Sequence, residues 1–183
     1  ICEKLEEGKL LRSDDFFSQQ FSNRATAEEL LEGVLFAAQR ECEEKKIPYL
    51  AKLYANICFE ETIDRATANM LIKQVEGLTY HQLVIMRVVG WMQTVAPDNI
   101  HAKPSYKTVE GMGKITVATE IFDLLRKSLL YSEGDVLGAG SLTPANLRIA
   151  GHGAHLFNLL ELSKMKIDQE FAGDIIDLLI EVK

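Results

Sequence analysis

Two histidines, His152 and His155, stand three positions apart in a segment with helical spacing. Residues three apart share one face of a helix, so two imidazoles at this spacing can approach one metal ion. A closed metal site needs further ligands, and no cysteine or acidic residue lies within a turn of the pair. The pattern therefore favours a surface pair of histidines, and the sequence predicts no metal site and no bound cofactor.

Other residue groups invite an enzymatic interpretation but do not sustain it. The run GMGK at 111–114 lacks the full Gly-x-x-x-x-Gly-Lys-Ser/Thr pattern of a phosphate-binding loop and a strand before it, so it is typical of a flexible connector. Cys58 with Tyr80 and His81 would supply a nucleophile and a base, yet nothing in the sequence brings the three together or adds an oxyanion site. The acidic clusters are typical of solvated helix faces: Glu28-Glu29, Glu41-Glu43-Glu44 and Glu60-Glu61. The sequence therefore predicts that the protein is not an enzyme.

Composition places the chain in the globular class. Of its 183 residues, 47% are hydrophobic and 26% are charged. The most apolar run, residues 83–92, is interrupted by Arg87 and falls well short of the roughly 18 residues that a membrane span needs. The three cysteines form neither an even disulfide set nor a metal-binding spacing, which favours a reducing, cytoplasmic compartment. The chain opens at Ile1 rather than at a methionine, which leaves room for a preceding leader or domain.

The distribution of charge limits the choice of partner. The formal net charge of −7 argues against a general binder of polyanions, because affinity for nucleic acid depends largely on Lys and Arg side chains that neutralise phosphates. Residues 98–148, however, contain six basic and six acidic side chains, so this segment is neutral between acidic flanks. Nucleic acid is therefore a possible partner of this neutral segment, although the net negative charge of the whole chain disfavours it.

The N-terminal part of the chain predicts a helical region. Thr26 and Glu29 have capping-box spacing at the start of a helix. Its inward face is expected to consist of Leu30, Leu31, Val34, Leu35 and Ala38. The charged run 40–46 is typical of a solvated helix end. Pro48 opens the next helix, and a third begins near Thr62 or Asp64.

The central part of the chain predicts a buried helix followed by a loop. Residues 83–92 are apolar on nearly every side, which predicts the central helix of the core. Prolines at 97 and 104 predict a loop over 95–106, and glycines at 111 and 113 predict that any helix over 107–114 is short or distorted. A last helix is expected after Asp168, which can cap it.

The stretch from Ile115 to Leu162 has the order helix, strand, glycine-rich loop, strand, helix, with the apolar alternation of residues 147–149 as the returning strand. This order resembles the C-terminal half of a winged-helix domain, in which a β-hairpin forms the wing. In regulators of this type, such as the multiple-antibiotic-resistance repressors, the entry into the last helix reads roughly Leu-x-Leu-Thr-Pro-x-Gly-x-x-Leu. Residues 147–156 match its apolar positions and, with Gly153, its glycine, whereas residues 150–151 replace Thr-Pro and Ser128 replaces the usual glycine after the first helix.

A second part of the resemblance lies upstream, and together the two parts imply a surface. Residues 78–83 read LTYHQL, similar to the Leu-Thr-x-x-Gln-Leu that often opens the first core helix of the family. The resemblance implies that the helix 115–130 is the counterpart of a recognition helix, with Glu120 and Asp123 among its outward positions. Carboxylates there count against DNA, because phosphates repel them. If DNA is bound, the contacting residues would be Lys114, Thr116, Thr119, Arg126 and Lys127 on this helix, with Arg148 at the wing.

These observations combine into one expectation. The chain is mainly α, with a helical N-terminal region (residues 1–77) packed on a degenerate winged-helix-like module with one β-hairpin (78–163) and a C-terminal helix (164–183) packing back on the core. We expect a non-enzymatic regulatory or protein–protein interaction module in the cytoplasm, which forms a homodimer or binds another protein, with a DNA-binding transcriptional regulator as the alternative.

Overall fold

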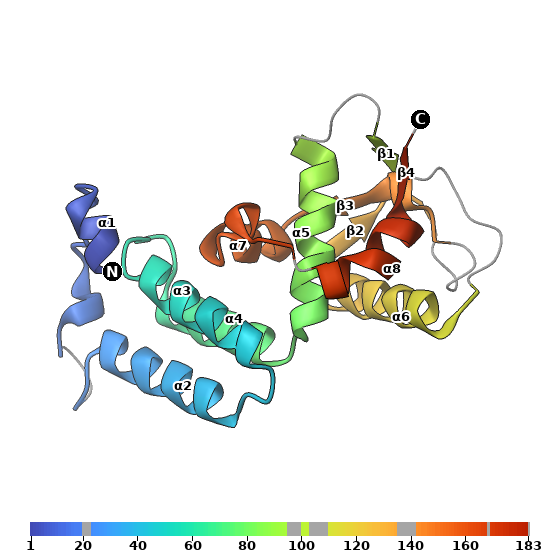
Figure 1. The fold of residues 1–183 in the computed structure, drawn as a ribbon. Helices are drawn as coiled ribbons and strands as arrows, with labels where there is room; N and C mark the ends of the chain where they lie inside the picture. Colours follow the sequence, from blue (N-terminus) through green and yellow to red (C-terminus); the bar gives the residue numbers. More distant parts are fainter. Residues whose placement is uncertain (20–22, 95–99, 103–109, 135–141, 168, 183) are drawn as a thin grey trace. The chain divides into compact units, whose positions relative to one another are not determined.

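The computed structural model describes residues 1–19, 23–94, 100–102, 110–134, 142–167 and 169–182 (Figure 1). The fold is mainly helical, as the sequence predicts, with antiparallel strand pairing in two places. The contacts within the chain divide it into two units, Ile1–Tyr80 and His81–Lys183. None of the helices in the described ranges has the length and apolar character needed to cross a membrane.

Unit 1 is built around three helices, which are preceded by a short exposed one. The helices are α1 (Cys2–Glu6), α2 (Thr26–Arg40), α3 (Ile47–Ile57) and α4 (Arg65–Glu76). Helix α2 contacts both α3 and α4, which also contact each other. Pro48 lies in the first turn of α3, and the Asp64 carboxylate accepts a hydrogen bond from the Thr67 amide at 2.7 Å to cap α4. Both helix starts were predicted from the sequence.

The buried face of α2 differs from the predicted one. Its inward residues are Ala27, Leu30, Val34 and Ala37, whereas Leu31 and Leu35 are exposed, the latter at 60%. The capping residue also differs, because Glu28 rather than Glu29 accepts a hydrogen bond from the backbone amide before the helix. Two apolar stripes lie next to each other on α2, so periodicity alone could not tell which one packs on α3 and α4.

The charged run 40–46 begins at the end of α2 and is largely exposed, as the sequence predicts, but its last residue is buried. Lys46 is 2% exposed, and its ammonium group donates to the backbone carbonyls of Glu76 at 2.9 Å and Leu78 at 2.6 Å. The same group forms an ion pair with Glu41. Lysine is rarely buried without such partners, and here they come from a segment about thirty residues away, which local charge patterning cannot reveal.

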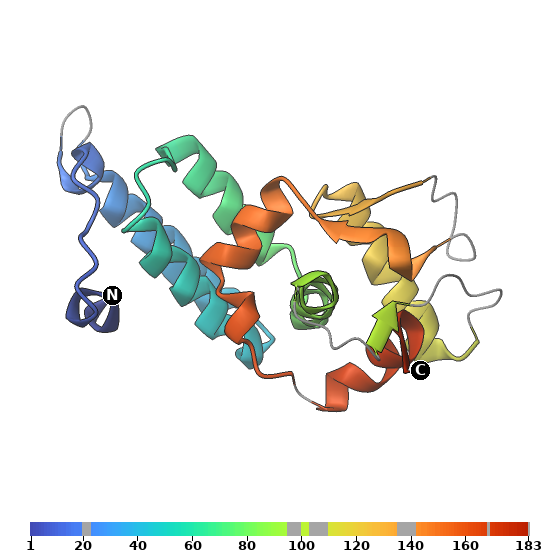
Figure 2. The ribbon, with the colours of Figure 1, turned by 90° about the horizontal axis from the view of Figure 1, so that it is seen from above.

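Unit 2 contains the predicted central helix. Helix α5 (Tyr80–Thr94) begins at the boundary between the units, and its residues 82–86 are all buried. The other helices are α6 (Met112–Arg126), α7 (His152–Leu159) and α8 (Gln169–Leu179). Figure 2, which looks along α5, shows these elements arranged around it. Residues 82–86 and 88–90 of this helix are buried, as an apolar run requires, whereas Arg87, Trp91 and Met92 are partly exposed.

The β-hairpin expected from the sequence is present. Strand β2 (Leu130–Ser132) pairs antiparallel with β3 (Leu147–Ile149), with Tyr131 opposite Arg148. Helix α6 precedes the hairpin and α7 follows it. The first helix ends at Arg126 rather than at the predicted residue 130, because Ser128 adopts a left-handed backbone conformation with φ of 57° that α-helix does not allow.

A second antiparallel pair was not predicted. Strand β1 (Ile100–Ala102) lies in the segment expected to be a loop, and it pairs with β4 (Ile180–Val182) after the last helix. Strands this short carry little periodic signal, and their partners are remote in sequence. The expected cap at Asp168 lies outside the described residues.

Candidate functional site

The outer face of α6 is more apolar than a recognition helix for DNA would be. Met112 is 78% exposed and Ile115 is 45% exposed, and the threonines that follow them, Thr116 and Thr119, are exposed too. Each threonine hydroxyl donates to the backbone carbonyl four residues earlier, at 3.0 Å and 2.9 Å respectively. The hydroxyls are thereby turned back onto the helix, and this face presents methyl and thioether groups.

The basic residues proposed for DNA contact are mostly engaged by carboxylates. Lys114 lies 3.5 Å from Asp177, and Lys127 forms an ion pair with Asp123 four residues earlier on α6. Arg148 lies 3.6 Å from Glu133 and also donates to the backbone carbonyl of Ala145 at 2.7 Å. Arg126, by contrast, is exposed and forms no ion pair or hydrogen bond within the described ranges. Of the four basic residues predicted to contact DNA, only Arg126 lacks an ion pair within the described ranges. Binding of a DNA backbone needs several cations that are free to contact phosphates.

The two carboxylates of α6 do not point outward as the family comparison implies. The Glu120 carboxylate pairs with Nδ1 of His81 on α5, and both side chains are largely buried. Asp123 accepts a hydrogen bond from the Gln82 amide at 2.8 Å. Helix α6 thus directs both acidic residues toward the first turn of α5, where Glu120 is largely buried and Asp123 is 38% exposed and paired with Lys127.

These polar contacts change the acidity of their members. The hydrogen bond to Glu120 raises the pKa of His81 above its ordinary value, against the opposing effect of burial. Hydrogen bonds from Lys127 and Gln82 lower the pKa of the Asp123 carboxyl. Sequence reasoning missed this cluster, because its members lie about forty residues apart and only the packing of α5 on α6 brings them together.

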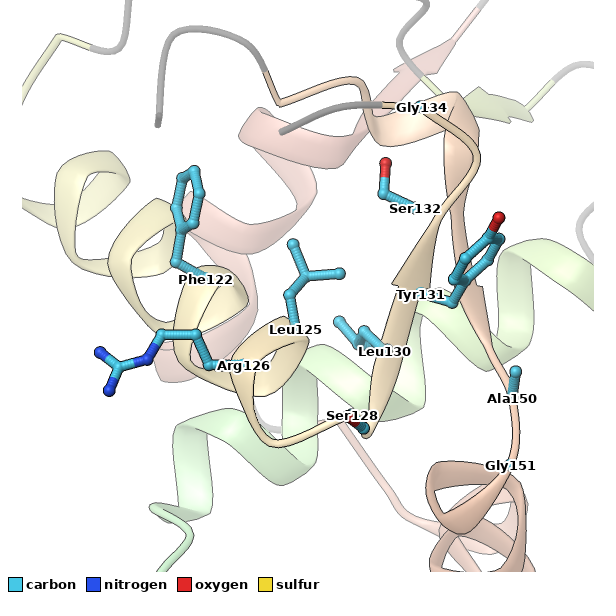
Figure 3. Close-up of a pocket in the computed structure, with 10 residues that line it drawn as sticks. All are labelled: Phe122, Leu125, Arg126, Ser128, Leu130, Tyr131, Ser132, Gly134, Ala150 and Gly151. Atoms are coloured by element: carbon cyan, nitrogen blue, oxygen red, sulfur yellow. The ribbon is translucent and has the colours of Figure 1, made fainter. Parts of the chain in front are cut away.

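A hollow of about 530 Å³ opens between the C-terminal half of α6 and strand β2. Figure 3 shows Leu125 rising from α6 and Leu130 pointing toward that helix, while Tyr131 points away from α6. Phe122 completes the apolar wall on α6, and Arg126 extends outward from the same helix. The lower end is formed by Ser128, Ala150 and Gly151. Apolar walls with a few polar groups are typical of sites that bind a ligand.

The remaining candidates from the sequence do not gather into a catalytic or metal site. His152 and His155 are both exposed on α7, and in the described ranges no three His, Cys, Asp or Glu side chains come close enough to hold a metal ion. Cys58 is buried, and burial raises the pKa of its thiol, which disfavours the reactive thiolate.

The run at 111–114 forms the start of α6 rather than a connector. A Cβ added at Gly113 would lie 3.0 Å from Oδ1 of Asp174 on α8, so a carboxylate already approaches the backbone at this helix start. Negative charge there opposes the binding of phosphate.

No protein-family model matches the chain, and no curated protein or solved structure is significantly similar to it. The function therefore has to be inferred from the geometry of the described surfaces.

Proposed function

We propose that this protein is a non-enzymatic regulatory module that binds another protein through the outer face of α6 and the adjoining hairpin. The observation that carries the proposal is the apolar surface formed by Met112, Ile115 and the hollow beside Phe122, at a place where the neighbouring cations are held by carboxylates. Exposed apolar surface next to a concave site is characteristic of protein interaction sites.

The winged-helix comparison is part of this proposal. Support comes from the order α6, β2, β3, α7 and from two positions in the compared frame. Ser128 has the left-handed conformation for which the family uses glycine. Gly153, the matching glycine, packs so closely on the backbone of Leu129 that an added Cβ would lie 2.7 Å from its carbonyl carbon. The left-handed backbone at Ser128 and the close packing at Gly153 therefore account for these two positions of the compared pattern through backbone geometry, without any contact to a ligand.

The partner is another protein or a second copy of the chain, and the setting we propose is the cytoplasm, where the exposed thiols of Cys2 and Cys42 stay reduced. Unit 1 supports self-association independently. Leu31, Leu35 and Phe36 form an exposed apolar stripe on α2, defined by these three residues. A two-fold axis beside this stripe would bury it against its own copy, as in an isologous dimer.

The test of the proposed function compares surface variants of the full chain. Ile115→Asp places a charge in the proposed face, whereas Ser163→Asp places the same charge at an exposed position away from α6. Proteins retained by the wild-type chain from cells that produce it are quantified after chemical cross-linking. We expect Ser163→Asp to retain the same set and Ile115→Asp to lose it, with unchanged thermal unfolding for both variants. Equal retention by Ile115→Asp, or no specific retention by the wild type, contradicts the proposal.

DNA binding is the second candidate, favoured by the arrangement of α6 and the hairpin and by the exposed Arg126. It predicts that a fluorescent random-sequence duplex binds at low ionic strength, that binding weakens steeply as salt rises, and that Arg126→Glu removes it. On the leading proposal the duplex shows no change in anisotropy at the lowest salt concentration, and a clear, salt-sensitive change would favour the regulator of transcription instead.

A further inference from the structure

One edge of β2 has backbone groups without a hydrogen-bond partner in the described part of the chain. Glu133 donates its amide to the Asn146 carbonyl at 3.1 Å, across the hairpin. Hydrogen-bonded and non-hydrogen-bonded pairs alternate along an antiparallel ladder, so Tyr131 and Arg148 form the next hydrogen-bonded pair. The N–H and C=O groups of Leu130 and Ser132 must then point away from β3.

The other strand supports this assignment of directions. Ile149, which lies opposite Leu130, donates its amide to the side-chain oxygen of Gln93 at 3.1 Å and therefore away from β2. The outer edge of β3 thus has a side-chain partner from α5. On the outer edge of β2, the Ser132 carbonyl accepts from the Gly134 amide at 2.9 Å. No partner outside the ladder occurs, within the described ranges, for the Leu130 amide, the Leu130 carbonyl or the Ser132 amide.

The hollow beside α6 runs along this unpaired edge. Its lining includes three consecutive residues, 130, 131 and 132. Successive side chains of a strand point to opposite faces, so a hollow that touches three in a row meets the strand at its edge. The opposite wall is Phe122 and Leu125 of α6. A segment lying in the hollow would therefore have backbone donors and acceptors on one side and apolar side chains on the other.

We propose that the partner contributes an extended peptide segment, which adds to the edge of β2 as a third strand and inserts an apolar side chain between Leu125 and Leu130. This inference rests on the proposed function and names the form of the partner. An extended segment alone can exchange hydrogen bonds with Leu130 and Ser132, because the backbone groups of a helix are satisfied internally. The hollow, at about 530 Å³, is large enough for one or two side chains of such a segment.

The charge of the rim selects among extended segments. Arg126 is exposed on the α6 wall, and no other group in the described ranges forms an ion pair with it. Its guanidinium extends from α6 away from β2 (Figure 3), so an acidic residue of the peptide can pair with Arg126 where the segment leaves the hollow over the C-terminal end of α6. The predicted ligand is an extended peptide with an aliphatic or aromatic anchor and a neighbouring Asp or Glu.

The experiment uses random linear peptides displayed on phage and selected against the full chain. The best peptide is synthesised with a single N-methyl group at each amide in turn, which removes one donor of the ligand and leaves the protein unchanged. We expect sensitivity at every second position, with a loss of roughly fivefold to tenfold in affinity at the amides that face β2. Sensitivity with a spacing of three and four positions would indicate a helical ligand and would overturn the proposal, as would failure to select any peptide.

Protein variants provide the second arm. Ser132→Pro removes the outward amide of β2 and should abolish binding, whereas Ser132→Ala keeps that amide and should bind as the wild type does. Arg126→Glu should lose peptides with an acidic residue, and a peptide with Lys in place of that residue should bind Arg126→Glu in preference to the wild type. Binding that is indifferent to Arg126→Glu and to N-methylation overturns strand addition.

The result separates this inference from the proposed function. If Ile115→Asp still loses its cross-linked partner while no peptide shows alternate-position sensitivity, the interaction face stands and strand addition is wrong. If the wild type retains no partner and selects no peptide, both proposals fail.

Discussion

The close contact between Gly153 and Leu129 makes a direct test of how the hairpin is held between α6 and α7. Gly153 lies in the first turn of α7 and is buried. An added Cβ would lie 2.7 Å from the carbonyl carbon of Leu129, 2.9 Å from its Cα and closer still to its carbonyl oxygen. These are backbone atoms, so a rotamer change cannot relieve the clash. The Gly153→Ala substitution must move α7 away from the start of β2.

The size of the effect follows from two opposing terms. Alanine in place of glycine within a helix stabilises it by about 1 kcal/mol. Forcing a methyl group into a well-packed core costs about 1–3 kcal/mol, and more where only the backbone can yield. Because the clash at Gly153 is with backbone, its cost lies at or above about 3 kcal/mol, and for Gly153→Ala we expect a net loss of about 2 kcal/mol or more in the free energy of unfolding.

Urea unfolding followed by circular dichroism measures this loss. The matched control is Gly173→Ala, because Gly173 is exposed in α8 of the same unit and an added Cβ there meets nothing within 4 Å. The control should be stabilised by up to about 1 kcal/mol. If Gly153→Ala is stabilised as much as Gly173→Ala, then α7 does not start against the backbone of Leu129 and the helix–hairpin–helix arrangement is wrong.

Further predictions concern the buried ion pair, the histidine and the exposed stripe. Lys46→Met leaves the Glu41 carboxylate without its buried partner, so chemical unfolding should show a loss of about 3–5 kcal/mol. The Glu120 carboxylate raises the pKa of His81 in the folded state, so the stability from this pair is complete below the unfolded pKa and is lost as pH rises through the folded value. As pH rises above the ordinary pKa of histidine, the unfolding free energy of the wild type should therefore fall more than that of His81→Gln. Leu35→Asp should turn a dimer into a monomer in sedimentation velocity.

Each of these predictions has its own control. Lys73→Met removes an exposed lysine of the same unit and should leave stability within about 0.5 kcal/mol of wild type. Asp174 also contributes to the raised pKa of His81, so Asp174→Asn should reduce the pH dependence without removing it. Ala66→Asp adds a charge at an exposed site of α4 and should leave sedimentation unchanged. If the unfolding free energies of wild type and His81→Gln change with pH in parallel, the His81–Glu120 pair contributes nothing to stability. If the wild-type chain is monomeric at every concentration, the stripe on α2 is not a dimer interface.

The features that the sequence predicted well are those with a local signal. The prediction of the central helix is confirmed, because a run that is apolar on every side has one physical solution, which is burial on every side. The prediction of antiparallel pairing within residues 129–149 is also confirmed. The apolar alternation of 147–149 indicated one strand, and the apolar residues at the end of the preceding helix indicated the other. Asp64 and Pro48 marked helix starts through the hydrogen bond and the backbone angle that each residue type supplies.

The features that the sequence did not predict depend on the choice of packing partner. Leu31 and Leu35 have the same spacing as the buried pair Leu30 and Val34, so only the position of α3 and α4 decides between the two stripes. Lys46 looked solvated because two of its partners are backbone carbonyls from a remote segment, which have no signature in sequence. The same holds for the hydrogen bond between His81 and Glu120, which joins two helices whose facing positions no local pattern specifies.

The hollow beside β2 shows why charge counting along the chain gave an incomplete view of the partner. From the sequence, Glu120 was expected to point outward and so to oppose DNA binding, but its side chain faces α5. Lys114 and Lys127 form ion pairs with Asp177 and Asp123 respectively. Most of these charged groups thus form ion pairs with one another within unit 2. The outer face of α6 therefore neither attracts nor repels phosphate strongly. Among the residues that the structure describes, this face is left with apolar surface, Arg126 without an ion pair, and an edge of β2 whose backbone groups have no partner. A protein segment can satisfy all three at once, whereas a nucleic acid can satisfy only the arginine.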